Sequence, residues 1–462
     1  MENTTETNLE KTPNKFGQWL KKSNSIRLFI IGVLTLVLLI PLFFVQNLIQ
    51  ERSVRQRQVI NEINGKWGEE VLVLGPVLKL PYTTVAKRTI TDPATKETCV
   101  ETYEKTKNLF ILPDRLDINA QVKPEIKKRG MYRTSVYTAK MKFAGNFSLP
   151  DLTAIDISRT DLIWKKAKVI LKTSNLKGVR EKVAINVNGH HYNLSSSYEP
   201  ENKQDNNKVA LNILESSPLR ESDNAISKPL SFNLDLVMNG SEYLRFIPVG
   251  KTTTAQMTSP WLTNNFVGNY LPYNNDKQTK TGVDARWKVL DINRPFPKVF
   301  SQNLPELREY AFGVNFMVPV DEYQKSERST KYGFLVIGLT FLIFFLIQTM
   351  SKIYMHPFNY LMIGLALVIF YTLLISISEH SGFLIAYLIA GLSVIVLITL
   401  YSKAILNRKF ALFIMASLTM LYTFIYVIVQ LENYALLVGS IGLFSILAAV
   451  MYTSRKLDWG SN

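Results

Sequence analysis

Six apolar stretches constrain this chain more than any other feature of its sequence. Each holds about 18 or more mostly apolar residues, enough for a helix to cross ~30 Å of hydrocarbon. They cover Leu28–Ile49, Tyr332–Met350, Phe358–Ser376, Phe383–Tyr401, Phe410–Gln430 and Tyr434–Tyr452. Residues 50–331, in contrast, have the composition of a water-exposed domain. The sequence therefore predicts an integral membrane protein with a six-helix transmembrane bundle and one large domain outside the membrane.

The first apolar stretch differs from a cleaved secretory signal. Basic residues precede it, as they precede a signal, but its apolar part is longer than a signal core. No small-residue cleavage pattern follows it, because the chain continues with the polar segment "QERSVRQRQ". We therefore expect an uncleaved signal anchor that remains as the first transmembrane helix.

Charges in the short connections between the apolar stretches predict the orientation. The connections on one side, with the C-terminal tail, carry Lys352, Lys403, Arg408, Lys409, Arg455 and Lys456. The short connections on the other side carry Glu379, His380 and Glu432, and no Lys or Arg. Because basic loops stay in the cytoplasm, both termini are expected there. The expected segments are a tail (1–27), a first span (28–49), an outward-facing domain (50–331), a five-helix region (332–453) and a C-terminal tail (454–462).

The outer domain has a surplus of positive charge. Residues 50–331 contain 42 Lys and Arg against 31 Asp and Glu, and the whole chain has a formal net charge of +16. This surplus favours anionic neighbours such as lipid head groups or envelope polymers, although simple solubility explains it equally well. No nucleic-acid-binding motif accompanies the basic clusters at 123–130 and 164–172, so nucleic acid is not an expected partner. Cys99 is the single cysteine, which excludes an intrachain disulfide.

A helix is expected to lead out of the first span. Ile60, Ile63 and Trp67 recur at helical spacing in "IQERSVRQRQVINEINGKWG", and Asn64-Gly65 is a plausible end of that helix. Its basic residues next to the hydrocarbon suit the level of the lipid head groups. These residues are Arg52, Arg55 and Arg57.

The rest of the outer domain predicts β-strands. β-branched and aromatic residues, often alternating with polar ones, fill six segments bounded by Gly, Pro or Asn. The segments are 71–82, 132–147, 182–188, 229–240, 284–292 and 312–318. This pattern favours a mainly antiparallel, sandwich-like domain. Segment 196–228 is polar and is expected to be a long surface excursion.

The sequence contains no recognisable catalytic motif. It lacks the metalloprotease, nucleophile-elbow, phosphate-loop and serine–lysine patterns. His190 and His191 are adjacent, and on a strand they point to opposite faces, so they cannot share one metal ion. We expect no enzyme, no catalytic residue, no cofactor and no metal site. An unrecognised envelope hydrolase is left as a minor alternative.

Glu379, His380 and Glu432 are the titratable residues of the two predicted outer turns. Gly382 follows the Glu379–His380 pair and is well placed to start the next helix. The simpler interpretation is a solvated helix turn. The more specific interpretation is that the three residues bind basic side chains of the outer domain and so fix that domain to the helices. His380 would then make this contact sensitive to pH.

Several ordered motifs resemble one known family. They include Trp67-Gly68, Gly75-Pro76 and Pro81-Tyr82 after the first span, Trp261 and Arg294 late in the outer domain, and "SRKLDW" with Arg455, Asp458 and Trp459. These motifs are similar to those of the CreD family, bacterial inner membrane proteins linked to cell envelope integrity. The sequence departs from the family at Gln348, where an acid is common.

The resemblance implies a multi-pass protein of the bacterial inner membrane with a periplasmic domain, active in envelope or cell-wall stress. It brings no catalytic residues. We expect membrane lipids as neighbours and a periplasmic protein or envelope polymer as partner of the β domain. A lipid or small-molecule transporter with a periplasmic capture domain is the alternative, and the sequence does not set the oligomeric state.

Overall fold

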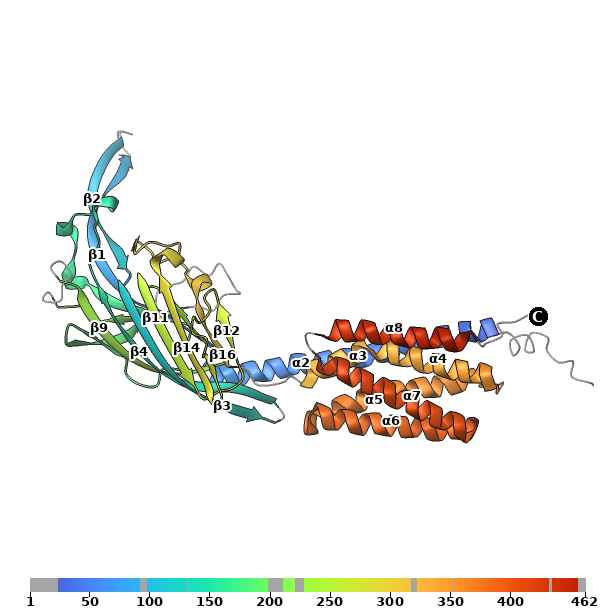
Figure 1. The fold of residues 1–462 in the computed structure, drawn as a ribbon. Helices are drawn as coiled ribbons and strands as arrows, with labels where there is room; N and C mark the ends of the chain where they lie inside the picture. The colour runs from blue at the N-terminus through green and yellow to red at the C-terminus, as the bar shows by residue number, and fades with distance from the viewer. Residues whose placement is uncertain are drawn as a thin grey trace, which may run out of the picture. The chain divides into compact units, whose positions relative to one another are not determined.

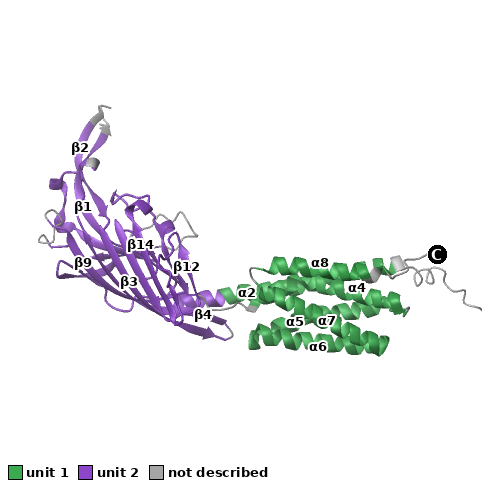
Figure 2. Cartoon of the chain, in the orientation of Figure 1, with its two compact units in different colours: residues 1–57, 320–462 green, residues 58–319 purple. Residues whose placement is uncertain are grey.

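The apolar stretches of the sequence form helices in a computed structural model. The structure describes residues 24–91, 98–130, 132–197, 211–220, 228–316, 322–351, 353–431 and 434–455. The chain divides into a helical unit, residues 1–57 and 320–462, and a β unit, residues 58–319 (Figure 2).

The helical unit is built from α-helices that lie side by side (Figure 1). They are α2 (Asn24–Trp67), α3 (Glu322–Lys331), α4 (Gly333–Ser351), α5 (Pro357–Ser381), α6 (Phe383–Ile405), α7 (Arg408–Gln430) and α8 (Ala435–Ser454). In the described part of the chain, all of these except α3 are long and apolar enough to cross a membrane. Residues 58–67 of α2 belong to the β unit, so α2 contributes to both units.

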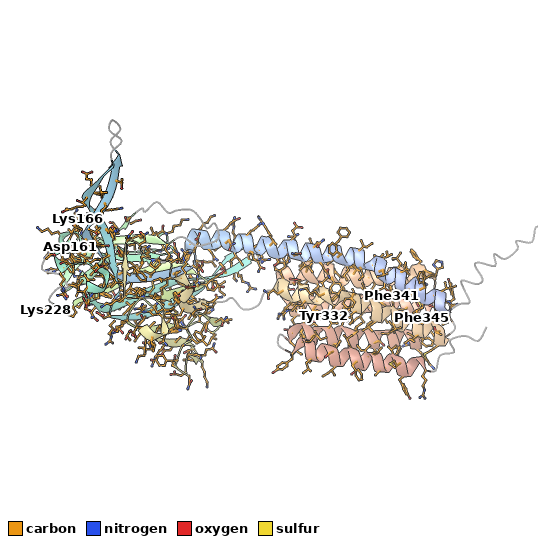
Figure 3. All side chains as sticks on the ribbon, turned by 90° about the horizontal axis from the view of Figure 1, so that it is seen from above. Asp161, Lys166, Lys228, Tyr332, Phe341 and Phe345 are labelled. Atoms are coloured by element: carbon orange, nitrogen blue, oxygen red, sulfur yellow. The ribbon has the colours of Figure 1, made fainter. Side chains whose placement is uncertain are left out.

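The core of the helical unit lies around α4 and α5. Phe341 and Phe345 of α4, labelled in Figure 3, are fully buried, as are Phe370 and Tyr371 of α5. In the most apolar stretch of α5, 56% of the residues are buried, whereas in the most apolar stretch of α8 no residue is buried. Helix α5 is therefore central and α8 peripheral, although their hydropathies are similar.

The β unit contains sixteen strands in its described residues. The first eight are β1 (Val71–Thr91), β2 (Thr98–Ile111), β3 (Arg115–Arg129), β4 (Tyr132–Phe147), β5 (Lys168–Thr173), β6 (Ala184–Val187), β7 (His190–Ser197) and β8 (Asn212–Ser216). The others are β9 (Leu230–Ser241), β10 (Tyr243–Ile247), β11 (Thr252–Ser259), β12 (Asn264–Gly268), β13 (Gln278–Thr279), β14 (Gly282–Leu290), β15 (Val299–Ser301) and β16 (Phe312–Phe316).

These strands form one continuous sheet. Its order is β12-β16-β10-β1-β5-β8-β7-β6-β9-β4-β3-β11-β14-β13, with β2 paired to β1 and β15 paired to β2. The pairs β1–β10 and β3–β11 are parallel, and the other strand pairs of the described residues are antiparallel. The β unit is thus mostly antiparallel.

Aromatic contacts show that the two halves of this sheet pack face to face. Phe143 of β4 lies against Phe246 of β10, with ring centroids 6.0 Å apart. Trp287 of β14 lies 5.3 Å from Phe312 of β16. From Leu230 to Leu236 of β9, buried and exposed residues alternate, as expected for a strand with one face on the core. The predicted fold class, membrane-length helices with a mainly antiparallel, sandwich-like β domain, is confirmed.

Two local predictions are wrong. Helix α2 does not end at Asn64-Gly65 but continues to Trp67, because Asn64 is held by side-chain hydrogen bonds instead of acting as a cap. Segment 196–228 is not wholly a surface excursion, because it contains β8, which pairs with β5 and β7 in the sheet. Ile213 and Leu214 of β8 are buried in the core.

Candidate functional sites

Glu379 lies at the C-terminal end of α5 and is held by two residues of the helical unit. Its Oε1 accepts a hydrogen bond from the Tyr323 hydroxyl of α3 at 2.9 Å. Arg52 Nε of α2 lies 3.9 Å from the same oxygen. The Glu379 side chain is 12% exposed, whereas that of Arg52 is 48% exposed. Three helices thus meet at one carboxylate, which has both a neutral and a cationic partner.

His380 and the turn beside it are exposed. His380 Nδ1 lies 3.2 Å from the Ser376 carbonyl oxygen of its own helix. The turn between α5 and α6 is made by Gly382, whose φ of 81° is the left-handed region that favours glycine. Glu432 lies outside the described residues. Docking of Glu379, His380 and Glu432 on the β unit stays a prediction.

The basic residues predicted at the lipid head groups lie along α2. Arg52, Arg55 and Arg57 are all exposed. Arg52 is the member of this group that reaches Glu379. Their contact with lipid stays a prediction.

Trp67, the last residue of α2, is fixed in the β unit. Its indole N–H donates to the Tyr137 carbonyl oxygen at 3.4 Å. Lys127 Nζ lies 4.3 Å from the ring centroid and the Arg180 guanidinium lies 5.5 Å from it. Such cation–π contacts stabilise the position of an indole ring. The Trp of the Trp-Gly motif therefore anchors the end of α2 on β3 and β4.

Gly68 and Gly75 are needed where the backbone passes close to other strands. A Cβ at Gly68 would lie 2.7 Å from the Asn239 carbonyl oxygen, and the φ of Gly68 is +153°. Gly75-Pro76 lies where the β1–β5 register shifts between Leu74 and Val77. Both motifs shape the β unit; neither presents a reactive group.

Arg294 is a buried cation whose contacts are with backbone carbonyl oxygens and an aromatic ring. Its Nε donates to the Gly250 carbonyl oxygen at 3.1 Å, and an Nη donates to that of Phe296 at 2.9 Å. The guanidinium also stacks 4.4 Å from the Phe296 ring centroid. Burial lowers the pKa of Arg294. Arg294 thus ties the segment after β14 to the loop before β11.

The remaining motif residues are peripheral or undescribed. Trp261 is half-buried and packs against the core of the β unit. The Arg455 guanidinium, at the end of α8, lies 5.9 Å from the Tyr452 ring centroid. Asp458 and Trp459 lie outside the described residues.

A two-stranded arm of the β unit was not anticipated from the sequence. Residues 84–91 of β1 and 98–105 of β2 have strand partners only in each other, within the described residues. Figure 1 shows this β1–β2 arm extending away from the other strands. Val85, Val100 and Tyr103 on it are 69%, 63% and 44% exposed. The available signal was a β-branched run on each side of Asp92-Pro93, a turn dipeptide.

In the described part of the helical unit, the fully buried polar side chains are neutral. The Tyr360 hydroxyl of α5 donates to Gln348 Oε1 of α4 at 2.7 Å, and both side chains are buried. Among the described residues, no group of three or more His, Cys, Asp or Glu side chains could hold a metal ion.

Comparison with known proteins identifies the family. The family described as inner membrane protein CreD matches residues 23–460. Inner membrane protein CreD of Escherichia coli (strain K12) is 28% identical over 435 residues, which cover 92% of this chain and 91% of that protein. Together with the membrane-length helices, this match indicates a multi-pass inner membrane protein. The chain belongs to the CreD family of inner membrane proteins.

Proposed function

We propose that this protein maintains the cell envelope under stress by binding a periplasmic protein through the β1–β2 arm of its β unit. The observation that carries the proposal is the arm itself, residues 84–91 and 98–105. An isolated two-stranded hairpin is marginally stable in water, yet this one exposes Val85 and Val100. A partner that covers these side chains would remove apolar surface from water.

The backbone of the arm supports the same proposal. The outer edges of residues 84–91 and 98–105 have no strand partner among the described residues. Unpaired edges of this kind accept an extended segment of another protein as an added strand. The arm therefore offers backbone hydrogen bonds for affinity and the exposed Val and Tyr side chains for specificity.

The proposed orientation places the β unit in the periplasm, and both termini in the cytoplasm. It rests on the basic residues of the short connections, such as Lys403, Arg408 and Arg455. The short connections at the opposite ends of the helices carry no Lys or Arg. Ile292→Cys, made together with Cys99→Ser so that it is the single thiol of the chain, should react with an impermeant thiol reagent in intact spheroplasts.

The first test is site-specific photo-crosslinking in stressed cells. A photoreactive amino acid at Val85 or Val100 is expected to capture a discrete periplasmic protein. The matched control is Ile292, an apolar residue of the β unit that is 87% exposed but lies outside the arm. Equal capture from all three positions would contradict the proposal.

The second test removes the arm. Residues 84–105 are replaced by an Asn-Gly turn, which closes a two-residue hairpin. The shortened protein is expected to reach the membrane at the normal level but to leave cells sensitive to detergents and cell-wall antibiotics. Full stress tolerance with the shortened protein would refute a role for the arm.

Transport is the weaker candidate. The buried polar side chains of the described spans include Thr340, Gln348, Ser378 and Ser402, and none of the buried ones is charged. Transporters of polar substrates commonly place charged groups at such depths. The described spans therefore offer no buried charge for the transport of a polar substrate, and we do not propose transport.

A further inference from the structure

We propose that the groove between α4, α7 and α8 binds an acyl chain of an anionic phospholipid, with Lys409 holding the lipid phosphate. The groove has a volume of about 720 Å³ and lies within the helical unit. This inference concerns the membrane-spanning helices and does not depend on the partner of the β unit.

The groove exists because α8 packs loosely. Helix α8 has no buried residue in its most apolar stretch. In the corresponding stretches of α4 and α7, 50% and 39% of the residues are buried. Gly442 of α8 lies against α7, because an added Cβ there would lie 2.1 Å from Phe424. Toward its C-terminal end α8 leaves an open apolar channel over α7, flanked on the other side by α4.

The lining of the groove is almost entirely apolar. Leu346 and Met350 of α4, Phe413 and Met420 of α7, and Ile446 of α8 are typical of it. The hydroxyl of Ser445 donates to the Ile441 carbonyl oxygen of its own helix at 2.9 Å. A hydrocarbon chain is therefore the chemistry that this lining can accommodate.

The α4 and α8 sides of the groove are about as long as one leaflet of a membrane, and its α7 side, from Lys409 to Phe424, is longer at ~22 Å. Its α4 lining runs from Leu339 to Met350, which spans ~16 Å along a helix. Its α8 lining runs from Gly442 to Val450, or ~12 Å. One leaflet contributes ~15 Å of hydrocarbon. An acyl chain that enters at the Lys409 end would thus fill the groove to about the middle of the bilayer.

Charge at one end of the groove selects the head group. Among the described residues of the lining, Lys409 is the single charged one, and it lies in the first turn of α7, next to Arg408. The C-terminal ends of α4 and α8 meet the groove at this same end, at Met350 and Val450. Within the part of the chain that the structure describes, no acidic side chain lines the groove. A phosphate at the membrane surface would therefore meet positive charge and no competing carboxylate.

The test is photo-labelling of the full-length protein in bilayer nanodiscs. The probes are phosphatidylglycerol and phosphatidylcholine that carry the same photoreactive acyl chain. Labelled peptides of α7 and α8 are quantified by mass spectrometry. Phosphatidylglycerol is expected to label the groove about fivefold more than phosphatidylcholine, the factor given by one basic residue near an anionic group.

Two pairs of variants separate the head group from the groove. Lys409→Gln should lower phosphatidylglycerol labelling about fivefold, whereas Lys403→Gln, at the exposed end of α6 outside the groove, should leave it unchanged. Ala449→Phe should fill the groove and abolish labelling by either probe. Ala448→Phe makes the same change on the exposed side of α8, outside the lining, and should not.

Three outcomes would overturn the inference. They are equal labelling by the two lipids, equal loss in Lys409→Gln and Lys403→Gln, and crosslinks from the groove to a second copy of the chain in place of lipid. Size-exclusion profiles establish that each variant is folded. If Ala449→Phe fails to fold, the pair of lysine variants still decides the result.

Discussion

The helical unit and the β unit handle buried polar groups in different ways. In the β unit, buried Glu215 of β8 bonds Lys79 Nζ of β1 at 2.7 Å and Lys168 Nζ of β5 at 2.9 Å. In the helical unit, buried Ser402 donates to the Ile398 carbonyl oxygen of its own helix. Neighbouring strands supply a buried charge with partners, whereas hydrocarbon outside a helix makes such a charge costly.

The comparison implies two sources of stability. The helical unit should depend on close apolar contact between helices, since its buried polar groups are neutral. The β unit should depend more on specific polar contacts between distant segments. Substitutions that change size in the first unit and charge in the second are therefore the sharpest tests.

The largest effect is expected from Gly364→Leu in α5. A Cβ at Gly364 would lie 2.0 Å from Leu38 Cδ1 and 2.9 Å from Phe341 Cζ. Leu38 and Phe341 are themselves buried, so neither side chain has room to move. Overpacking of this kind costs ~3 kcal/mol or more. The measurement is thermal unfolding of the purified protein in detergent.

Gly439→Leu in peripheral α8 is the matched control. The nearest atom to a Cβ at Gly439 is Ile428 Cδ1 at 3.9 Å, an ordinary van der Waals distance. Little change in the unfolding temperature is expected. Equal losses for the two glycine variants would contradict the division into a central α5 and a peripheral α8.

The second-largest loss of stability is expected from Arg294→Lys in the β unit. A lysine cannot bond the carbonyl oxygens of Gly250 and Phe296 together, because it lacks the planar fork of arginine. Loss of a buried hydrogen bond from a charged donor costs ~2 kcal/mol. Chemical unfolding followed by tryptophan fluorescence measures the change, since Trp287 is buried in the same unit.

Arg286→Lys controls for the loss of an arginine at the surface. The Arg286 side chain is 45% exposed and pairs with Asp284 at 2.9 Å. Exposed ion pairs contribute little to stability, so this variant should unfold nearly as the natural protein does. A larger loss for Arg286→Lys than for Arg294→Lys would show that burial of Arg294 is not what matters.

The two units also differ in what their sequences reveal. Segment 132–147 predicts a strand, and β4 has the same bounds. Alternation in 229–240 predicts the buried face of β9. The six apolar stretches likewise predict six membrane-length helices. These features are local, because each follows from the periodicity or hydropathy of one segment.

The features that the sequence did not predict depend on distant partners. Helices α5 and α8 are both apolar on all sides, so hydropathy does not distinguish the central helix from the peripheral one. The partners of Glu379 lie on α2 and α3, and no local pattern indicates this pairing. The β1–β2 arm was missed because charged residues interrupt the alternation of β2.

The third prediction uses pH to test the buried charge of the β unit. Burial tends to raise the pKa of Glu215, but hydrogen bonds from Lys79 and Lys168 outweigh it and lower that pKa. A carboxyl whose pKa is lower in the folded state stabilises the fold above its unfolded pKa of ~4.3. That contribution is lost as pH falls through the folded value.

Glu215→Gln should therefore unfold more easily than the natural protein at neutral pH, by ~1–2 kcal/mol. The difference should shrink in acid, once Glu215 is protonated in both states. Glu306→Gln, whose side chain is 48% exposed beside Arg308, is the matched control and should change little. A difference for Glu215→Gln that is constant from neutral to acidic pH would rule out the carboxylate charge as its cause.

The smallest effect is expected from Glu379→Gln in the helical unit. The amide oxygen of glutamine can still accept the hydrogen bond from the Tyr323 hydroxyl, so this variant removes only the charge that faces Arg52. Because the Arg52 side chain is half exposed, its ion pair at 3.9 Å contributes ~0–1 kcal/mol. Tyr323→Phe, which removes the hydrogen bond and keeps the charge, provides the comparison. Thermal unfolding in detergent should rank Tyr323→Phe as equally or more destabilised, and a loss in Glu379→Gln as large as that in Gly364→Leu would mean that the helical unit, like the β unit, depends on a charged contact.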